Sequence, residues 1–340
     1  MAKKEPNQSK GAAENRMSAS IDELLSAALE RGDESLETGR YIVTFKENAT
    51  EEGLRSLTTQ GLRVADARDF QDQAIMLENV GDAEAVTFPE IGAAVISGAA
   101  FSMRGLGALN DGTSDSAIEA IEPEYFAFAG ADAAGYLRGF RRAAEAIAQD
   151  LRTPDAEDVE TEEDPLVIGA TWGLIKCKVP PSLRSGLGIK VAVLDTGLDL
   201  GHPDFAGRAI VSQTFVGQPV QDLHGHGTHT CGTACGPKAP AGAIPRYGIA
   251  YRAPIFVGKV LNNVGSGSTA SVLAGMNWAI ANRCVVISMS LGAQTPVQAA
   301  YTAAGASALS KGCLIIAAAG NSSGLPTGAP ANSPTIMSVS

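Results

Sequence analysis

Five short apolar runs, separated by segments with helical periodicity, constrain the fold of this chain more than any other feature. Strands that are apolar along their whole length are typical of parallel sheets buried on both faces. Two amphipathic segments between the runs, Ser268–Asn282 and Pro296–Lys311, predict helices that cover such a sheet. The sequence therefore predicts an α/β fold with a doubly wound, mostly parallel sheet. The predicted strands are Lys190–Leu194, Ala209–Phe215, Ile255–Leu261, Cys284–Ser290 and Cys313–Ala319.

The first half of the chain has a different pattern. Apolar and polar side chains alternate over Arg40–Lys46, as in a strand with one buried face, and Thr50–Gly61 has the pattern of a helix that ends at glycine. Three more strands are predicted at Gln73–Glu78, Ala93–Ser97 and Ile118–Phe128. Together these segments predict a compact α+β domain over residues 40–129.

Residues 1–39 form a polar extension with one predicted helix, Ile21–Arg31. Ser20 and Glu23 stand in the capping-box positions before it, and Gly32 is placed to end it. The simplest interpretation is a short helix that docks on the body of the protein or stays solvated.

Residues 130–170 are predicted to be a linker. A helical stretch, Ala134–Leu151, precedes Asp155–Asp164, a run with seven acids in ten residues. Such a run repels itself and is most simply exposed, although a processing region or an electrostatic contact with the second half is the alternative.

Charge divides the chain at the same place. The formal net charge of −11 is the sum of −18 before residue 171, where 33 acids face 15 bases, and +7 after it, where 4 acids face 11 bases. An acidic chain without a lysine or arginine excess is not expected to bind nucleic acid. No apolar run reaches the roughly 18 residues of a membrane span, and the N-terminus lacks a secretory signal pattern.

All five cysteines lie in the second half, an odd number that suggests no disulfide framework. We therefore expect a reducing compartment and a cytoplasmic location, with export by a route that needs no signal peptide as the alternative.

Three polar groups follow predicted strands. Asp195 ends the first strand at a position where a nucleotide-binding fold would have phosphate-binding glycines. The four histidines of the chain, with two nearby cysteines, suggest either a zinc site or a general base at the start of a helix. Asn321 either donates a hydrogen bond into a cleft or occupies a turn.

Four motifs follow one another along the second half of the chain: D-T-G at Asp195, H-G-T-H at His226, S-L-G at Ser290 and A-A-G-N ending at Asn321. Residues 171–340 thereby resemble the subtilisin-like serine proteases. In a subtilisin the Asp and His are roughly 32 residues apart, and the oxyanion Asn follows the His by roughly 90; here the separations are 226 − 195 = 31 and 321 − 226 = 95. The resemblance implies that His226 is the general base, that Asp195 orients it and that Asn321 stabilises the oxyanion.

The resemblance also implies how substrate binds. An extended peptide is expected to add as a strand to two edges, and peptides or proteins are the expected substrates. No cofactor is required for the chemistry. Asp204 is the only residue to which the resemblance assigns a structural calcium ion. His224 and His229 are expected to be loop and helix-start residues. The implied substrate-binding residues are Gly265, Ser266, Gly267, Ser290, Leu291, Gly292 and Gly320.

Residues 40–129 resemble the ferredoxin-like prodomain that inhibits such proteases in cis and assists their folding. The nucleophilic serine is expected about 157 residues beyond the base, past Ser340, so residues 171–340 would be the N-terminal part of the catalytic domain and inactive alone. A G-T-S at Gly112–Ser114 lies before Asp195 and lacks the motif of the nucleophile. The alternative function is that of a peptide-binding pseudoprotease that does not cut.

Overall fold

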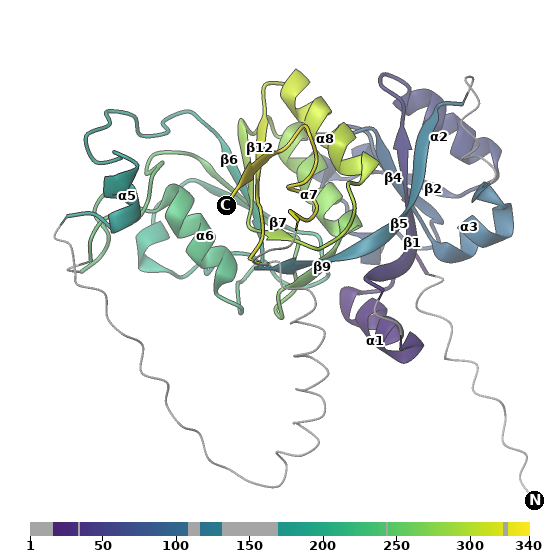
Figure 1. The fold of residues 1–340 in the computed structure, drawn as a ribbon, viewed down its shortest axis with the longest axis horizontal. Helices are drawn as coiled ribbons and strands as arrows, with labels where there is room; N and C mark the ends of the chain where they lie inside the picture. The colour runs from purple at the N-terminus through teal and green to yellow at the C-terminus, as the bar shows by residue number, and fades with distance from the viewer. Residues whose placement is uncertain (1–15, 33–34, 108–115, 131–168, 243, 322–325) are drawn as a thin grey trace, which may run out of the picture.

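The computed structural model describes residues 16–32, 35–107, 116–130, 169–242, 244–321 and 326–340. The predicted helix Ala134–Leu151, the acidic run Asp155–Asp164 and the sequence Gly112–Ser114 lie outside these residues. Two sheets with helices packed between and around them make up the described part of the chain (Figure 1).

The second half is built on a six-stranded sheet in the order β13–β12–β10–β6–β8–β7, and every neighbouring pair is parallel. This confirms the predicted α/β fold. The strands are β6 (Val191–Asp195), β7 (Ile210–Thr214), β8 (Ile255–Lys259), β10 (Val286–Met289), β12 (Leu314–Ala318) and β13 (Met337–Val339).

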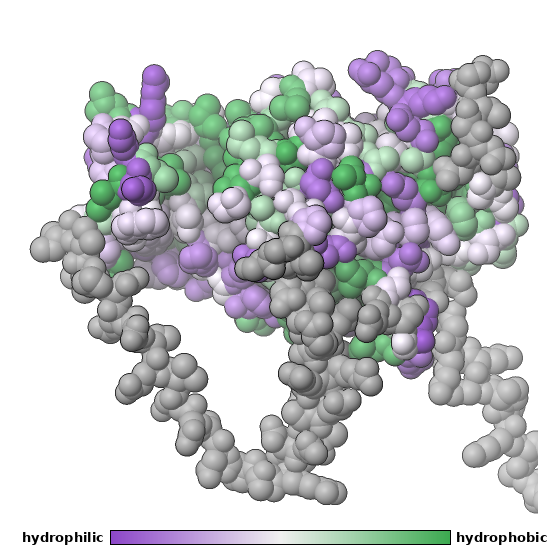
Figure 2. All heavy atoms as spheres, in the orientation of Figure 1, coloured by the Kyte–Doolittle hydropathy of each residue, from purple (hydrophilic) through white to green (hydrophobic). Residues whose placement is uncertain are grey.

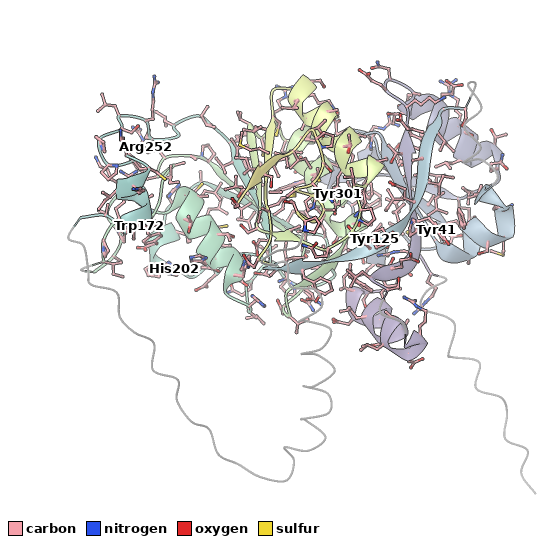
Figure 3. The ribbon with its side chains drawn as sticks, viewed as in Figure 1. Tyr41, Tyr125, Trp172, His202, Arg252 and Tyr301 are labelled. Carbon is pink, nitrogen blue, oxygen red and sulfur yellow. The ribbon has the colours of Figure 1, made fainter. Side chains whose placement is uncertain are left out.

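Helices cover both faces of this sheet, as the continuous apolar strands require. Helix α6 (His226–Cys235) packs against alternate residues of β6 and β8 on one face. Helices α7 (Thr269–Ala281) and α8 (Ala299–Ser310) pack on the other face. The short helix α5 (Trp172–Lys176) lies at the far end, where Figure 3 shows the exposed Trp172.

The first half forms an antiparallel sheet in the order β5–β1–β4–β3, with β2 added parallel to β3. Its outer surface carries α2 and α3, and Figure 2 shows hydrophilic residues gathered near α2. The elements are β1 (Glu37–Phe45), α2 (Thr50–Thr59), β2 (Val64–Asp66), β3 (Ala85–Phe88), β4 (Ala93–Ile96), α3 (Gly98–Arg104) and β5 (Ile118–Ala129).

One strand prediction in this half was wrong. Residues 73–78 do not form a strand; instead an irregular segment, residues 74–76, joins two short 3₁₀ turns, η2 (Gln71–Gln73) and η3 (Leu77–Asn79). Gln73 has a positive φ of 58°, which is incompatible with a continuous strand. Ile75 and Leu77 are nevertheless buried, because this segment packs against α7.

The two halves share one apolar core. Helices α7 and α8 lie between the parallel sheet and residues of the antiparallel half, so that nearly every residue of α7 is buried. Figure 3 places Tyr301 of α8 and Tyr125 of β5 near the middle of the molecule. Asn277 of α7 is fully buried and holds the first half by accepting from Glu90 N (2.8 Å) and donating to Gln73 Oε1 (3.0 Å).

The predicted N-terminal helix is confirmed as α1 (Ile21–Arg31), with its capping box at Ser20 and Glu23 and a left-handed Gly32 after it. It is docked on the protein, below β1 and β9 (Ser266–Ser268) in Figure 1. None of the helices within the described ranges combines the length and apolar character that crossing a bilayer requires.

Candidate active site

Asp195 and His226 meet where β6 ends and α6 begins. Asp195 Oδ1 lies 2.7 Å from His226 Nδ1, and the two side chains are 1% and 25% exposed. Asp195 also accepts from Thr196 N (2.7 Å) and from the Thr230 hydroxyl (3.2 Å). The carboxylate is therefore fixed by several donors, while the imidazole reaches the surface.

This contact sets the chemistry of the imidazole. The hydrogen bond with Asp195 raises the pKa of His226, and this effect outweighs partial burial, which lowers it. No described residue makes a hydrogen bond to Nε2. An imidazole held by a carboxylate at Nδ1 with Nε2 available has the geometry of a general base.

Asp222 is a second buried carboxylate that the sequence interpretation did not assign a role. It accepts from the Thr196 hydroxyl, from Thr228 and from the backbone amides of His224 and Gly225, at 2.7–3.0 Å. Burial alone would raise the pKa of Asp222, but these hydrogen bonds outweigh it and lower the pKa. Asp222 thus holds together the loop that presents His226.

Lys259 of β8 is fully buried beside the same loop and was also missed. Its ammonium group donates to Thr196 O and to Asn263 Oδ1 (2.8 Å). Burial lowers the pKa of Lys259 to about 8, against the opposing effect of Asp222 and Asp195.

After Asp195 the chain turns at Gly197, where φ is 110° and a Cβ would lie 2.1 Å from Val220 O, so the turn requires glycine.

Next to the loop that carries this pair, two strand edges of the second half hold β5 between them, and the space between these edges is called the groove below. Strand β9 (Ser266–Ser268) pairs with one side of β5 and β11 (Leu291–Gly292) with the other, both antiparallel. Phe128 lies opposite Ser266 on one side and Gly292 on the other. The predicted peptide-binding edges thus hold a peptide strand, and that strand belongs to the first half of the chain.

The predicted oxyanion residue lies at the end of this strand. Asn321 follows β12, and its Nδ2 donates to the main-chain oxygen of Gly130 at 2.9 Å. Ala129 N donates to Gly265 O, also at 2.9 Å. Ser290 and Gly320 are the neighbours of Leu291 and Asn321, but no hydrogen bond joins them to β5 in the described residues.

The His224 ring lies edge-on to the His226 ring, with 6.1 Å between the ring centroids, but in the described residues none of the other histidines forms a hydrogen bond with the Asp195–His226 pair. His224 and His229 are exposed, and His202 Nδ1 accepts from Asp204 N at 3.2 Å. Nowhere in the described ranges do three His, Cys, Asp or Glu side chains gather in a way that could hold a metal ion. Asp204 accepts from Ala241 N (2.7 Å) and from the Tyr247 hydroxyl, so hydrogen bonds from the chain itself engage both of its carboxylate oxygens.

Two glutamates of β5 contact the second half at helix starts. Glu122 Oε2 accepts from Ala299 N at the start of α8 (2.8 Å), and Glu124 Oε1 accepts from Ala270 N in the first turn of α7 (3.0 Å). Carboxylates at helix N-termini satisfy free amides and interact favourably with the helix dipole. The only sequence signal for them is their spacing of two in a strand, which puts both on one face.

The parallel sheet, the Asp195–His226 pair and the strand-binding edges define a site of the subtilisin type. Residues 186–340 match the model of the subtilase family, peptidase S8.

Similar proteins include Subtilisin Savinase of Lederbergia lenta and an alkaline protease of Alkalihalobacillus alcalophilus. Each is 40% identical to this chain over 173 residues, which are 49% of this chain and 62% and 44% of those proteins. Subtilisin-like protease 1 of Trichophyton rubrum is 36% identical over 186 residues, 50% of this chain and 35% of that protein. The matched region thus spans less than two thirds of each relative.

Proposed function

We propose that the protein is the precursor of a subtilisin-type serine endopeptidase, in which residues 40–129 are an inhibitory prodomain. The observation that carries this proposal is the 2.7 Å contact of Asp195 with His226 beside a groove that holds a peptide strand. A base oriented by a carboxylate, next to an extended main chain, is suited to attack on a peptide bond.

Each residue of the site has a role in this reaction. His226 Nε2 takes the proton of the serine hydroxyl as it attacks the carbonyl carbon and later passes it to the leaving amine. Asp195 holds the required tautomer and stabilises the imidazolium. Asn321 donates to the oxygen that becomes negatively charged. The proposal assigns the serine to a position after Ser340, at the spacing of the subtilisins.

Charge and contacts support the role of the first half as a prodomain in cis. Residues 1–170 carry −18 and residues 171–340 carry +7, and Glu122 and Glu124 place two of the acids at helix starts of the second half. The strand order β5–β1–β4–β3 supports the ferredoxin-like interpretation.

The peptide bond after Gly130 is the one we propose is cut during maturation. Gly130 O already accepts the hydrogen bond of Asn321 Nδ2 that the oxyanion would use. The sequence does not fix this bond, since residues 128–130 and 164–171 are both candidates, and the hydrogen bond favours the first.

A fluorophosphonate probe, which reacts with activated serines, tests the proposal. The complete gene product is expected to be labelled once its first 130 residues are removed, while residues 1–340 alone stay unlabelled. His226→Ala in the complete gene product should abolish labelling, and Asn282→Ala, a change of an amide away from the groove, should leave it intact. Absence of labelling in the complete, processed protein would instead support the peptide-binding pseudoprotease.

A further inference from the structure

Helix α1 covers the same stretch of β5 that fills the groove. Three of its aliphatic residues, Ile21, Leu24 and Leu25, form one buried cluster with Phe126 and Phe128 of β5. Both phenylalanine side chains are 1% exposed, and Val216 of the second half completes the cluster. The apolar face of α1 therefore packs on a surface built from both halves of the protein.

A polar contact joins α1 to the rim of the groove. Asp22 Oδ1 accepts from Asn262 Nδ2 at 2.9 Å, across 240 residues of sequence. Asn262 is 1% exposed, and its Oδ1 accepts from Val264 N and Ser266 N. The side chain that shapes the β9 edge of the groove is thus the one that holds the first turn of α1.

The segment before α1 is anchored as well. Met17 is buried and its main-chain oxygen accepts from Arg40 Nη1 at 3.0 Å. Arg40 pairs with Glu124 at 2.6 Å inside the protein, and Glu124 reaches the start of α7. Residues 17–31 are therefore fixed to β5, to the antiparallel sheet and to the second half.

We infer that residues 17–31 are a clamp that docks on the composite surface of β5, Val216 and Asn262 and holds β5 in the groove. The partner of this surface is a short amphipathic helix with an aliphatic face and a carboxylate in its first turn. Because half of the surface is β5 itself, the helix binds fully only when the groove is occupied. By thermodynamic reciprocity, docking of the helix then stabilises β5 in the groove by the same coupling free energy.

This inference rests on the proposed inhibitory role of β5, and hydrogen exchange of residues 1–340 tests it without any catalysis. Asp22→Ala removes the contact with Asn262, and Leu24→Ala removes part of the apolar face. Each is expected to speed exchange of the amides of residues 126–129 by about tenfold or more, with little change in β6 and β8. Asp22→Asn keeps an acceptor oxygen and should restore most of the protection.

Glu30→Ala is the matched control, because Glu30 is an exposed acid of the same helix. In a double-mutant cycle of Asp22→Ala and Asn262→Ala, the effects on exchange should not add, because either single variant already loses the Asp22–Asn262 hydrogen bond. The inference is overturned if α1 exchanges faster while residues 126–129 do not. It is also overturned if all strands speed up equally, because the helix would then supply only general stability.

The outcomes separate this inference from the proposed function. Faster exchange of β5 in the variants, together with failed serine labelling of the complete protein, would support the clamp and contradict the protease. Unchanged exchange, together with successful labelling, would support the protease and contradict the clamp.

Discussion

Asn321 donates a hydrogen bond to the carbonyl oxygen of Gly130, a residue 191 positions earlier in the chain. The contact joins the end of β12 to the end of β5. Gly130 has a φ of 74°, in the left-handed region that favours glycine, so the strand turns away where it reaches the amide. The proposed oxyanion donor therefore already engages a main-chain carbonyl.

Replacing Asn321 tests its catalytic role. In the complete gene product, Asn321→Ala is expected to slow maturation and peptide hydrolysis by about 10²–10³-fold, because one oxyanion donor is lost. N-terminal sequencing of the product that does form should still begin at Ala131. Normal rates in the variant, or a mature N-terminus between residues 164 and 171, would contradict the assignment.

The titration of His226 tests its pairing with Asp195. Because the hydrogen bond with Asp195 raises the pKa of His226, Asp195→Asn should lower it, as measured by NMR on residues 1–340. Asp199→Asn changes a carboxylate on the following loop and should leave this titration unchanged. An unaltered His226 titration in the Asp195 variant would show that the pair does not form.

The same shift has a consequence for stability. A histidine with a raised pKa contributes stability that is fully present below its ordinary pKa and is lost as the pH rises through the raised value. In wild-type protein we expect this contribution to fade on the alkaline side, and in Asp195→Asn to be absent. Urea unfolding at a series of pH values measures the difference.

Glu124 is expected to be essential for joining the halves. Glu124→Gln leaves the buried Arg40 without its counter-charge, which costs about 3–5 kcal/mol in such pairs. Burial would raise the pKa of Glu124, but Arg40 and the hydrogen bonds outweigh it and lower the pKa. The stability that Glu124 contributes to the protein is therefore fully present above the ordinary pKa of a glutamate and is lost as the pH falls through the lowered pKa.

Glu122→Gln provides the comparison. Glu122 is only partly buried and caps α8, so its loss of charge should cost about 1 kcal/mol or less. Urea unfolding of both variants gives the ranking. Equal losses would mean that the Arg40–Glu124 pair is no more important than a helix cap.

Cysteine labelling checks the burial of the thiols. Cys177 is exposed, whereas the other four cysteines, Cys231 and Cys235 of α6, Cys284 and Cys313, are buried. Burial raises the pKa of Cys235 to about 11 and that of Cys231 well above its ordinary value. Iodoacetamide at neutral pH should therefore modify one thiol, and Cys177→Ser should abolish it by mass spectrometry. Rapid labelling of Cys231 would contradict this packing.

Much of the fold was predictable because its signals are local. The apolar runs predicted β6, β7, β8, β10 and β12 to within a few residues, and the capping box and Gly32 predicted the two ends of α1. The prediction at Gln73–Glu78 failed because apolar residues of an irregular segment were buried by α7, which lies about 200 residues further along the chain.

The candidate site could be predicted from the sequence only at residues that belong to a motif. Motif spacing predicted Asp195, His226 and Asn321 as site residues, whereas Asp222 and Lys259 form hydrogen bonds with neighbours that only the fold brings close to them. The contact of α1 with Asn262 is equally invisible in the sequence, since it joins two ordinary polar residues across the whole molecule.

The length of strand β5 fixes which of its residues lie beside the second half. Its first part is in register with β1, with Tyr41 opposite Pro123, and its last part is in register with β9 and β11. A residue inserted between Pro123 and Phe126 would shift the end of the strand by about 3.3 Å and turn its side chains to opposite faces. Phe126 and Phe128 would then leave the cluster with α1, and a different carbonyl would face Asn321. The length of this strand thus sets which main-chain carbonyl faces Asn321, and with it the bond that we propose is cut.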